Sequence, residues 1–167
     1  QDKTTKTALD EVGIKSEVLH LPMEEGRFMT SLPPKSRVLV FTDETYRPLM
    51  DAVVKAMPDI NFDFVGFGEM KDIDEYSSII HLINPPSMTG GFRNMLINGR
   101  WAISNVKEPY AGYIHIDGDF EAAKKSLVNK IESFHELTEI NKEAQIYYLH
   151  QHNPESFHKM MERILSE

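Results

Sequence analysis

Apolar residues recur along the chain with two periods that alternate. Short apolar runs at residues 37–41, 62–67, 79–83, 101–104 and 113–116 are typical of strands buried on both faces of a parallel sheet. Apolar residues at helical spacing predict helices at 48–57, 120–134, 137–150 and 154–165, and a short helix follows residue 89. Strands alternating with helices predict a Rossmann-like, three-layer α/β fold with a parallel sheet and C-terminal helices.

The first part of the chain departs from this regular alternation. Residues 4–12 have helical spacing, residues 16–21 alternate like a strand, and the polar segment 23–36 contains Gly26, Pro33 and Pro34. We therefore expect residues 1–34 to be the end of a preceding domain plus a linker. A Rossmann-like domain would follow at 35–152, and a C-terminal helix at 153–167. Because the chain begins at Gln1, we expect it to be a piece of a longer protein.

Composition narrows the function classes. The 167 residues carry a net charge of -8 and show no basic stripe, so we expect no nucleic-acid binding. Cysteine is absent, which removes disulfides and thiolate chemistry. No apolar run approaches the roughly 20 residues of a membrane span, so we expect a cytoplasmic protein without a transmembrane segment. The seven histidines lack ligand spacing, which predicts exposed side chains and no metal site.

Three loops should meet at one edge of the sheet, because ligands of open parallel sheets bind beyond the C-terminal strand ends. They are residues 42–47, residues 66–70, and the segment 85–93, here named the Gly90 loop. Glycines that open a helix expose unpaired amides, and the helix dipole favours an anion there. This pattern predicts a phosphate-binding site, although each loop alone also fits an ordinary tight turn. The candidate binding residues are Thr42, Arg47, Gly66, Gly68, Thr89, Gly90, Gly91, Arg93 and Asn94.

Three familiar nucleotide and phosphate motifs are missing. A dinucleotide fingerprint would place three glycines after the first strand, where this chain has none. No Walker loop is present, which excludes an ATPase of that class. A phosphoacceptor receiver domain would carry an aspartate after the third strand, where Asn84 stands instead.

The order of several segments carries a family resemblance. They are the run from Thr7 to Ile14, the passage from Glu17 to Phe28, the strand 37–41, the glycine pair in Phe64-Val65-Gly66-Phe67-Gly68, Gly91-Phe92 with residues 94–103, and the final helix. Together they resemble the second half of a retaining GT-B glycosyltransferase that uses nucleotide sugars. In that family two glutamates eight positions apart lie on the donor loop and helix. Pro86 and Asn94 stand at those places.

The resemblance implies transfer of a sugar from a nucleotide-sugar donor to an unknown acceptor, with no metal or other cofactor. Thr89, Gly90, Gly91 and Arg93 would contact the diphosphate, with Arg47 as a further cation. Asn94 would bind the ribose, since an amide both donates and accepts hydrogen bonds. Residues after Gly66 would bind the base. The resemblance also implies a Rossmann-like domain preceding this one as a partner.

Two other functions fit the same residues. One is a noncatalytic Rossmann-like module that binds a partner or has lost its ligand, which the missing glutamates and acidic composition favour. The other is an enzyme that binds a different phosphorylated ligand at the same sheet edge. The sequence leaves all three open.

Overall fold

A five-stranded, fully parallel sheet forms the centre of the molecule. The computed structural model describes residues 10–11, 30–33, 37–66, 69, 72–116 and 118–166. The strand order is β2-β1-β3-β4-β5, and every neighbouring pair is parallel. The predicted Rossmann-like α/β fold is therefore confirmed. The strands are β1 (Arg37–Thr42), β2 (Asn61–Val65), β3 (Ser78–Leu82), β4 (Trp101–Ser104) and β5 (Gly112–Tyr113).

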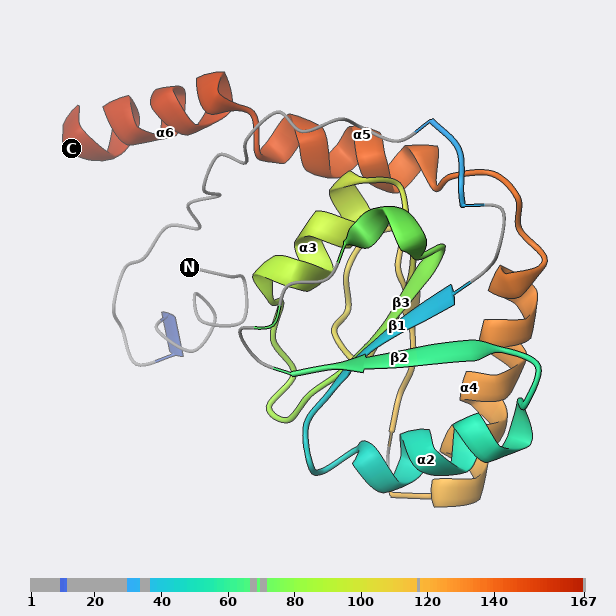
Figure 1. Ribbon diagram of the computed structural model, residues 1–167. Coiled ribbons are helices and arrows are strands. Elements are labelled where there is room, and N and C mark those ends of the chain that lie inside the picture. Colours follow the sequence, from blue (N-terminus) through green and yellow to red (C-terminus); the bar gives the residue numbers. More distant parts are fainter. Residues whose placement is uncertain are drawn as a thin grey trace.

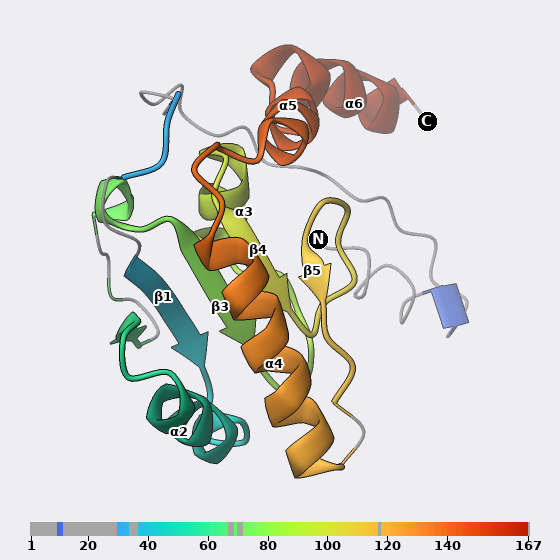
Figure 2. The same cartoon turned by 90° about the vertical axis from the view of Figure 1, so that its right-hand side faces the viewer.

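Helices cover both faces of the sheet and make three layers (Figures 1 and 2). Helices α2 (Arg47–Ala56) and α4 (Phe120–His135) pack on one face. Helices α3 (Gly90–Ile97) and α5 (Lys142–Gln151) pack on the other. A short 3-10 turn, η1 (Ile73–Glu75), precedes β3, and α6 (Pro154–Ser166) extends away beyond α5 (Figure 1). None of the described helices has the length and apolar character that a membrane span requires.

The alternation of side chains along the strands divides the core into two halves. Ile80 and Leu82 of β3 face α2 and α4, whereas Ile79 faces α3 and α5. All five residues of β3 are buried, as expected for a strand with a neighbour on each edge and helices on each face.

Two predicted elements within the described residues differ from the structure by three or more residues at one end, and both differences come from hydrogen bonding. The fifth strand was expected at 113–116 but spans Gly112–Tyr113, because it pairs only with the last two residues of β4. The helix expected at 137–150 begins at Lys142, where the side chain of Asn141 caps it by accepting from the amide of Ala144. Residues 137–141 instead form a loop whose Glu139 carbonyl accepts from the indole N–H of Trp101 at 2.9 Å.

The expected elements before residue 37 lie almost wholly outside the described residues. This applies to the helix at 4–12, the strand at 16–21 and the linker at 23–36. The domain boundaries placed at residues 34 and 152 stay predictions.

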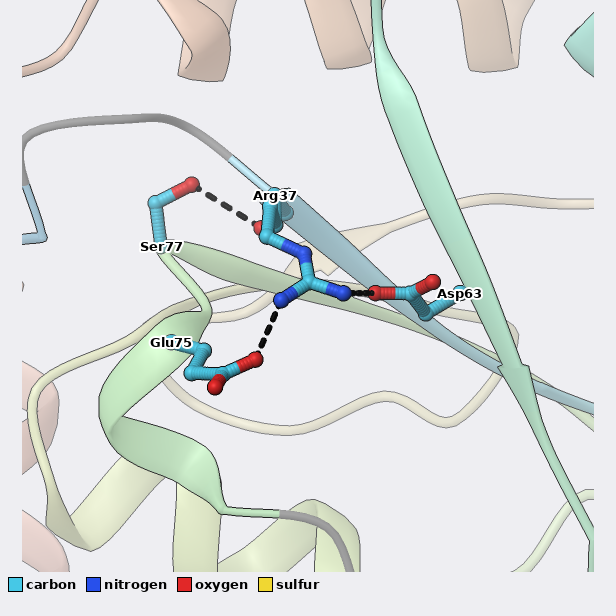
Figure 3. Close-up of polar contacts among 4 residues, drawn as sticks. All are labelled: Arg37, Asp63, Glu75 and Ser77. Atoms are coloured by element: carbon cyan, nitrogen blue, oxygen red, sulfur yellow. Dashed lines mark hydrogen bonds and ion pairs between the residues drawn. The ribbon is translucent and has the colours of Figure 1, made fainter.

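Arg37 ties three segments together at the N-terminal edge of the sheet (Figure 3). Its guanidinium forms ion pairs with Asp63 of β2 and Glu75 of η1, and it also lies 5.2 Å from the centre of the Tyr76 ring. The Arg37 carbonyl accepts from the Ser77 hydroxyl at 3.2 Å. These contacts fix the turn that leads into β3.

The C-terminus of α3 depends on Gly99. Its amide bonds the carbonyl of Leu96, and the amide of Arg100 bonds that of Met95, which is the Schellman arrangement. Gly99 has a φ of +70°, and a Cβ there would lie 3.1 Å from the Cβ of Ile140.

We predict that Gly99→Ala lowers the free energy of unfolding by about 1–2 kcal/mol, because a side chain opposes the left-handed backbone. Urea unfolding followed by the fluorescence of the single tryptophan, Trp101, measures the loss. Gly90→Ala is the matched control, since its φ is not positive and its Cβ would meet open space. Equal stability of the two variants would contradict the requirement for glycine at position 99.

Candidate functional site

The candidate site lies at the C-terminal ends of β1 and β3. The chain leaves β1 toward β2 on one side and leaves β3 toward β4 on the other, so the connections diverge at this point. Such a switch point is where open parallel sheets bind their ligands. Of the three loops expected at one edge, the loop after β1 is joined here to Asn84, which leads into the Gly90 loop.

Two polar side chains hold these loops in place. The Asp43 carboxylate accepts from the amides of Thr45 and Tyr46 at 3.0 and 3.3 Å and from that of Asn84 at 2.5 Å. The Asn105 side-chain amide donates to the carbonyl of Ile83 at 2.8 Å, which extends the link to β4. The sheet edge is therefore defined by side-chain hydrogen bonds as well as by the strands.

The Gly90 loop opens α3 with two free amides. Thr89 is the N-cap, and its hydroxyl oxygen accepts from the amide of Phe92 at 3.3 Å. The amides of Gly90 and Gly91 have no partner within the described part of the chain. Neither glycine has a positive φ, and a Cβ on either would meet nothing within 4 Å. The fold does not require glycine here, and both residues are exposed.

Arg93 lies one turn into α3, and its side chain turns back toward the start of the helix. Its Nε donates to the Sδ of Met88 at 3.3 Å, which leaves the terminal guanidinium nitrogens without a partner among the described residues. Burial raises the pKa of Tyr148 above its usual range, and the nearby Glu108 carboxylate adds to that rise while Arg93 opposes it. The Tyr148 hydroxyl donates to Glu108 at 2.8 Å. Arg93 therefore lies close to Tyr148 as well as to the Gly90 loop.

A buried histidine beneath the Gly90 loop was not foreseen. His81 of β3 is 0% exposed, and its ring is stacked between those of Phe41 and Phe92. Its Nε2 lies 3.1 Å from the Thr89 hydroxyl and its Nδ1 lies 3.3 Å from the Ser104 hydroxyl. Burial lowers the pKa of His81 to about 4, so the imidazole is neutral near pH 7.

The expectation that the histidines are exposed is wrong for two of them. His81 and His152 are buried, whereas His115, His135, His150 and His158 are exposed. The missed signal for His81 was its place inside the apolar run 79–83, where a strand buried on both faces leaves no exposed position. Among the described residues no cluster of three metal-ligating side chains occurs.

The other candidate residues are engaged differently. Arg47 donates to Asp51 at 2.9 Å, and its guanidinium lies 3.9 Å from the centre of the Phe64 ring, on the β2 side. The hydroxyl of Thr42 donates to the carbonyl of Asp43, beside the switch point. The Oδ1 of Asn94 accepts from Asn98 at 3.0 Å.

Gly66 lies at the end of the edge strand β2, separated from β3 by β1. Its amide donates to the Glu69 carboxylate at 3.1 Å. Gly68 lies outside the described residues. The structure thus brings Thr89, Gly90, Gly91 and Arg93 together. It holds the hydroxyl of Thr42, the side chain of Arg47 and the amide of Gly66 in other contacts.

A pocket occurs elsewhere in the described structure. An open pocket of about 550 Å³ is lined by Trp101, Tyr110 and residues 136–143. It lies at the N-terminal end of β4, and its charged lining comprises three glutamates and one lysine. That charge does not suit a phosphate, so the Gly90 loop remains the candidate site.

Comparison with known proteins adds no assignment. No family model matches the chain, and no curated protein matches it.

The buried His81 predicts a loss of stability in mild acid. Between about pH 6.5 and pH 4 the unfolded chain binds a proton at this residue that the native state does not, so unfolding becomes more favourable as the pH falls. The stabilisation of the native state by neutral His81 is complete above the pKa that this residue has in the unfolded chain. It is lost by about pH 4, which lowers the free energy of unfolding by about 3 kcal/mol in total. Urea unfolding of the wild type and of His81→Gln across this range isolates the effect. Parallel curves for the two proteins would refute it.

Proposed function

We propose that this chain is the donor-binding half of a GT-B-type glycosyltransferase, which transfers a sugar from a nucleotide sugar to an acceptor. The observation that carries the proposal is the start of α3 at the β1–β3 switch point. It combines the amides of Gly90 and Gly91 with a cation, Arg93, and neither these amides nor the terminal guanidinium nitrogens have a partner among the residues that the structure describes. Amides at a helix N-terminus together with an arginine suit a diphosphate.

The proposed chemistry uses this charge distribution. As the bond between the sugar and the diphosphate breaks, negative charge grows on the departing phosphate oxygens. Donors fixed before the reaction stabilise that charge without reorganising. The amides of Gly90 and Gly91 and the guanidinium of Arg93 would supply them, and Asn94 would contact the ribose through its Nδ2. The acceptor and the remaining catalytic groups would come from a preceding Rossmann-like domain.

We predict that Arg93→Ala weakens binding of the preferred nucleotide sugar about tenfold or more, because a hydrogen bond to a charged group is lost. Calorimetry with a panel of UDP-, GDP- and ADP-sugars identifies the donor and measures the change. Arg47→Ala is the matched control, since Arg47 already pairs with Asp51 and should leave the affinity unchanged.

The pattern of results separates the candidate functions. Binding of a nucleotide sugar that depends on Arg93 supports the transferase. Binding of sugar-free phosphates alone favours an enzyme for another phosphorylated ligand. No binding across the panel favours a noncatalytic module and overturns the proposal.

Gly91→Ala tests whether a ligand approaches the backbone of the Gly90 loop. The added methyl group meets open space in the free protein, so we predict that the free energy of unfolding stays equal or rises by about 0.5 kcal/mol. Nucleotide-sugar affinity should fall at least about fivefold, because the methyl group occupies the approach to the amides. Unchanged affinity in a stable variant would place the ligand elsewhere.

A further inference from the structure

The buried chain of contacts from Ser104 through His81 to Thr89 contains few protons, and they can be counted. The Ser104 hydroxyl oxygen accepts from the amide of Val106 at 3.0 Å, and the Thr89 hydroxyl oxygen accepts from the amide of Phe92. Each hydroxyl has one proton to donate, and a neutral imidazole has one N–H and one acceptor nitrogen. The hydrogen bonds among these three side chains can therefore be arranged in two ways, according to which ring nitrogen of His81 carries the proton.

The first arrangement places the proton on Nδ1. His81 then donates to Ser104, and Thr89 donates its proton inward to Nε2. The Ser104 hydroxyl would accept twice, and its own proton would have no acceptor among the described residues. Ser104 is 0% exposed, so that proton would also have no water. An unmade hydrogen bond at a buried polar group is costly.

The second arrangement places the proton on Nε2. Ser104 donates to Nδ1 and accepts from Val106, so the buried hydroxyl is satisfied. His81 then donates to the Thr89 oxygen, which also accepts from Phe92. The Thr89 proton has no inward acceptor left, and Thr89 is the partly exposed member of the chain. The leftover donor thus falls at the surface, where water or a ligand can accept it.

We propose that His81 is a positioning residue: it is held in the Nε2–H form and thereby directs the Thr89 hydroxyl proton outward as a third neutral donor beside the amides of Gly90 and Gly91. The identity of the ligand rests on the proposed function: the atom that accepts the Thr89 proton would be an oxygen of a phosphate or diphosphate. The stacking of the imidazole between Phe41 and Phe92 fixes the plane of the ring. The depressed pKa of His81 agrees with a neutral ring in this role.

The tautomer can be measured without any ligand. Long-range ¹H–¹⁵N correlation spectra of the labelled protein at neutral pH show which ring nitrogen is protonated, and the His81 signals are those missing from His81→Gln. We expect the Nε2–H form. An Nδ1–H form overturns the inference, whatever the protein binds.

The donor role is tested with UDP and with inorganic pyrophosphate as probes. Thr89→Val removes the hydroxyl, and we expect it to weaken binding about fivefold. Thr89→Ser keeps the hydroxyl and should bind within about twofold of the wild type. Urea unfolding of both variants shows that they are folded. Equal affinity of Thr89→Val and Thr89→Ser overturns the donor role.

The results with the two probes distinguish the role of the Thr89 hydroxyl from the proposed transferase function. Pyrophosphate binding that needs the Thr89 hydroxyl, without nucleotide binding, supports the inference while the transferase proposal fails. UDP binding that ignores the hydroxyl leaves the transferase standing and overturns the inference. Absence of binding to both probes overturns the donor role and the transferase together.

Discussion

The complete burial of β3 is the constraint on which the rest of the structure depends. The strand has β1 and β4 on its edges, α2 and α4 on one face and α3 and α5 on the other, so all five of its residues are buried. An imidazole at this place must be neutral and must find its partners within the protein. His81 finds them in Ser104 and Thr89. The imidazole of His81 therefore links the packed sheet to Thr89, the residue that caps α3 at the candidate site.

The two ends of α3 show how the same residue type serves different purposes. Gly99 ends the helix in a left-handed conformation against Ile140, and the fold requires glycine there. Gly90 and Gly91 begin the helix with ordinary backbone angles and open space around them. Their absent side chains leave the amides accessible at the β1–β3 switch point, the place where a parallel sheet offers a site. That contrast distinguishes a structural glycine from candidate binding glycines.

Much of the fold could be predicted from the sequence because its signals are local. The apolar runs marked four of the five strands closely, and the caps Asp119 and Asn153 marked the starts of α4 and α6, where their side chains accept from backbone amides. The start of α5 and the length of β5 were missed because both depend on distant partners. Asn141 caps α5 within a loop tied to Gly99, and β5 ends where β4 stops. The position of the Gly90 loop was predictable, whereas the contact of the Arg47 guanidinium with the ring of Phe64 was not, because β2 lies beside β1 only in the folded sheet.

By itself, the sequence determined the alternation of strands and helices, the glycine-opened helix after the third strand and the presence of an arginine in its first turn. Each of these follows from spacing along the chain, which tertiary contacts do not alter. Tertiary structure alone decided which histidines are buried and which side chains surround them. These properties depend on segments separated by twenty or more residues, as with His81 and Ser104, whose proximity arises only when β3 and β4 pair.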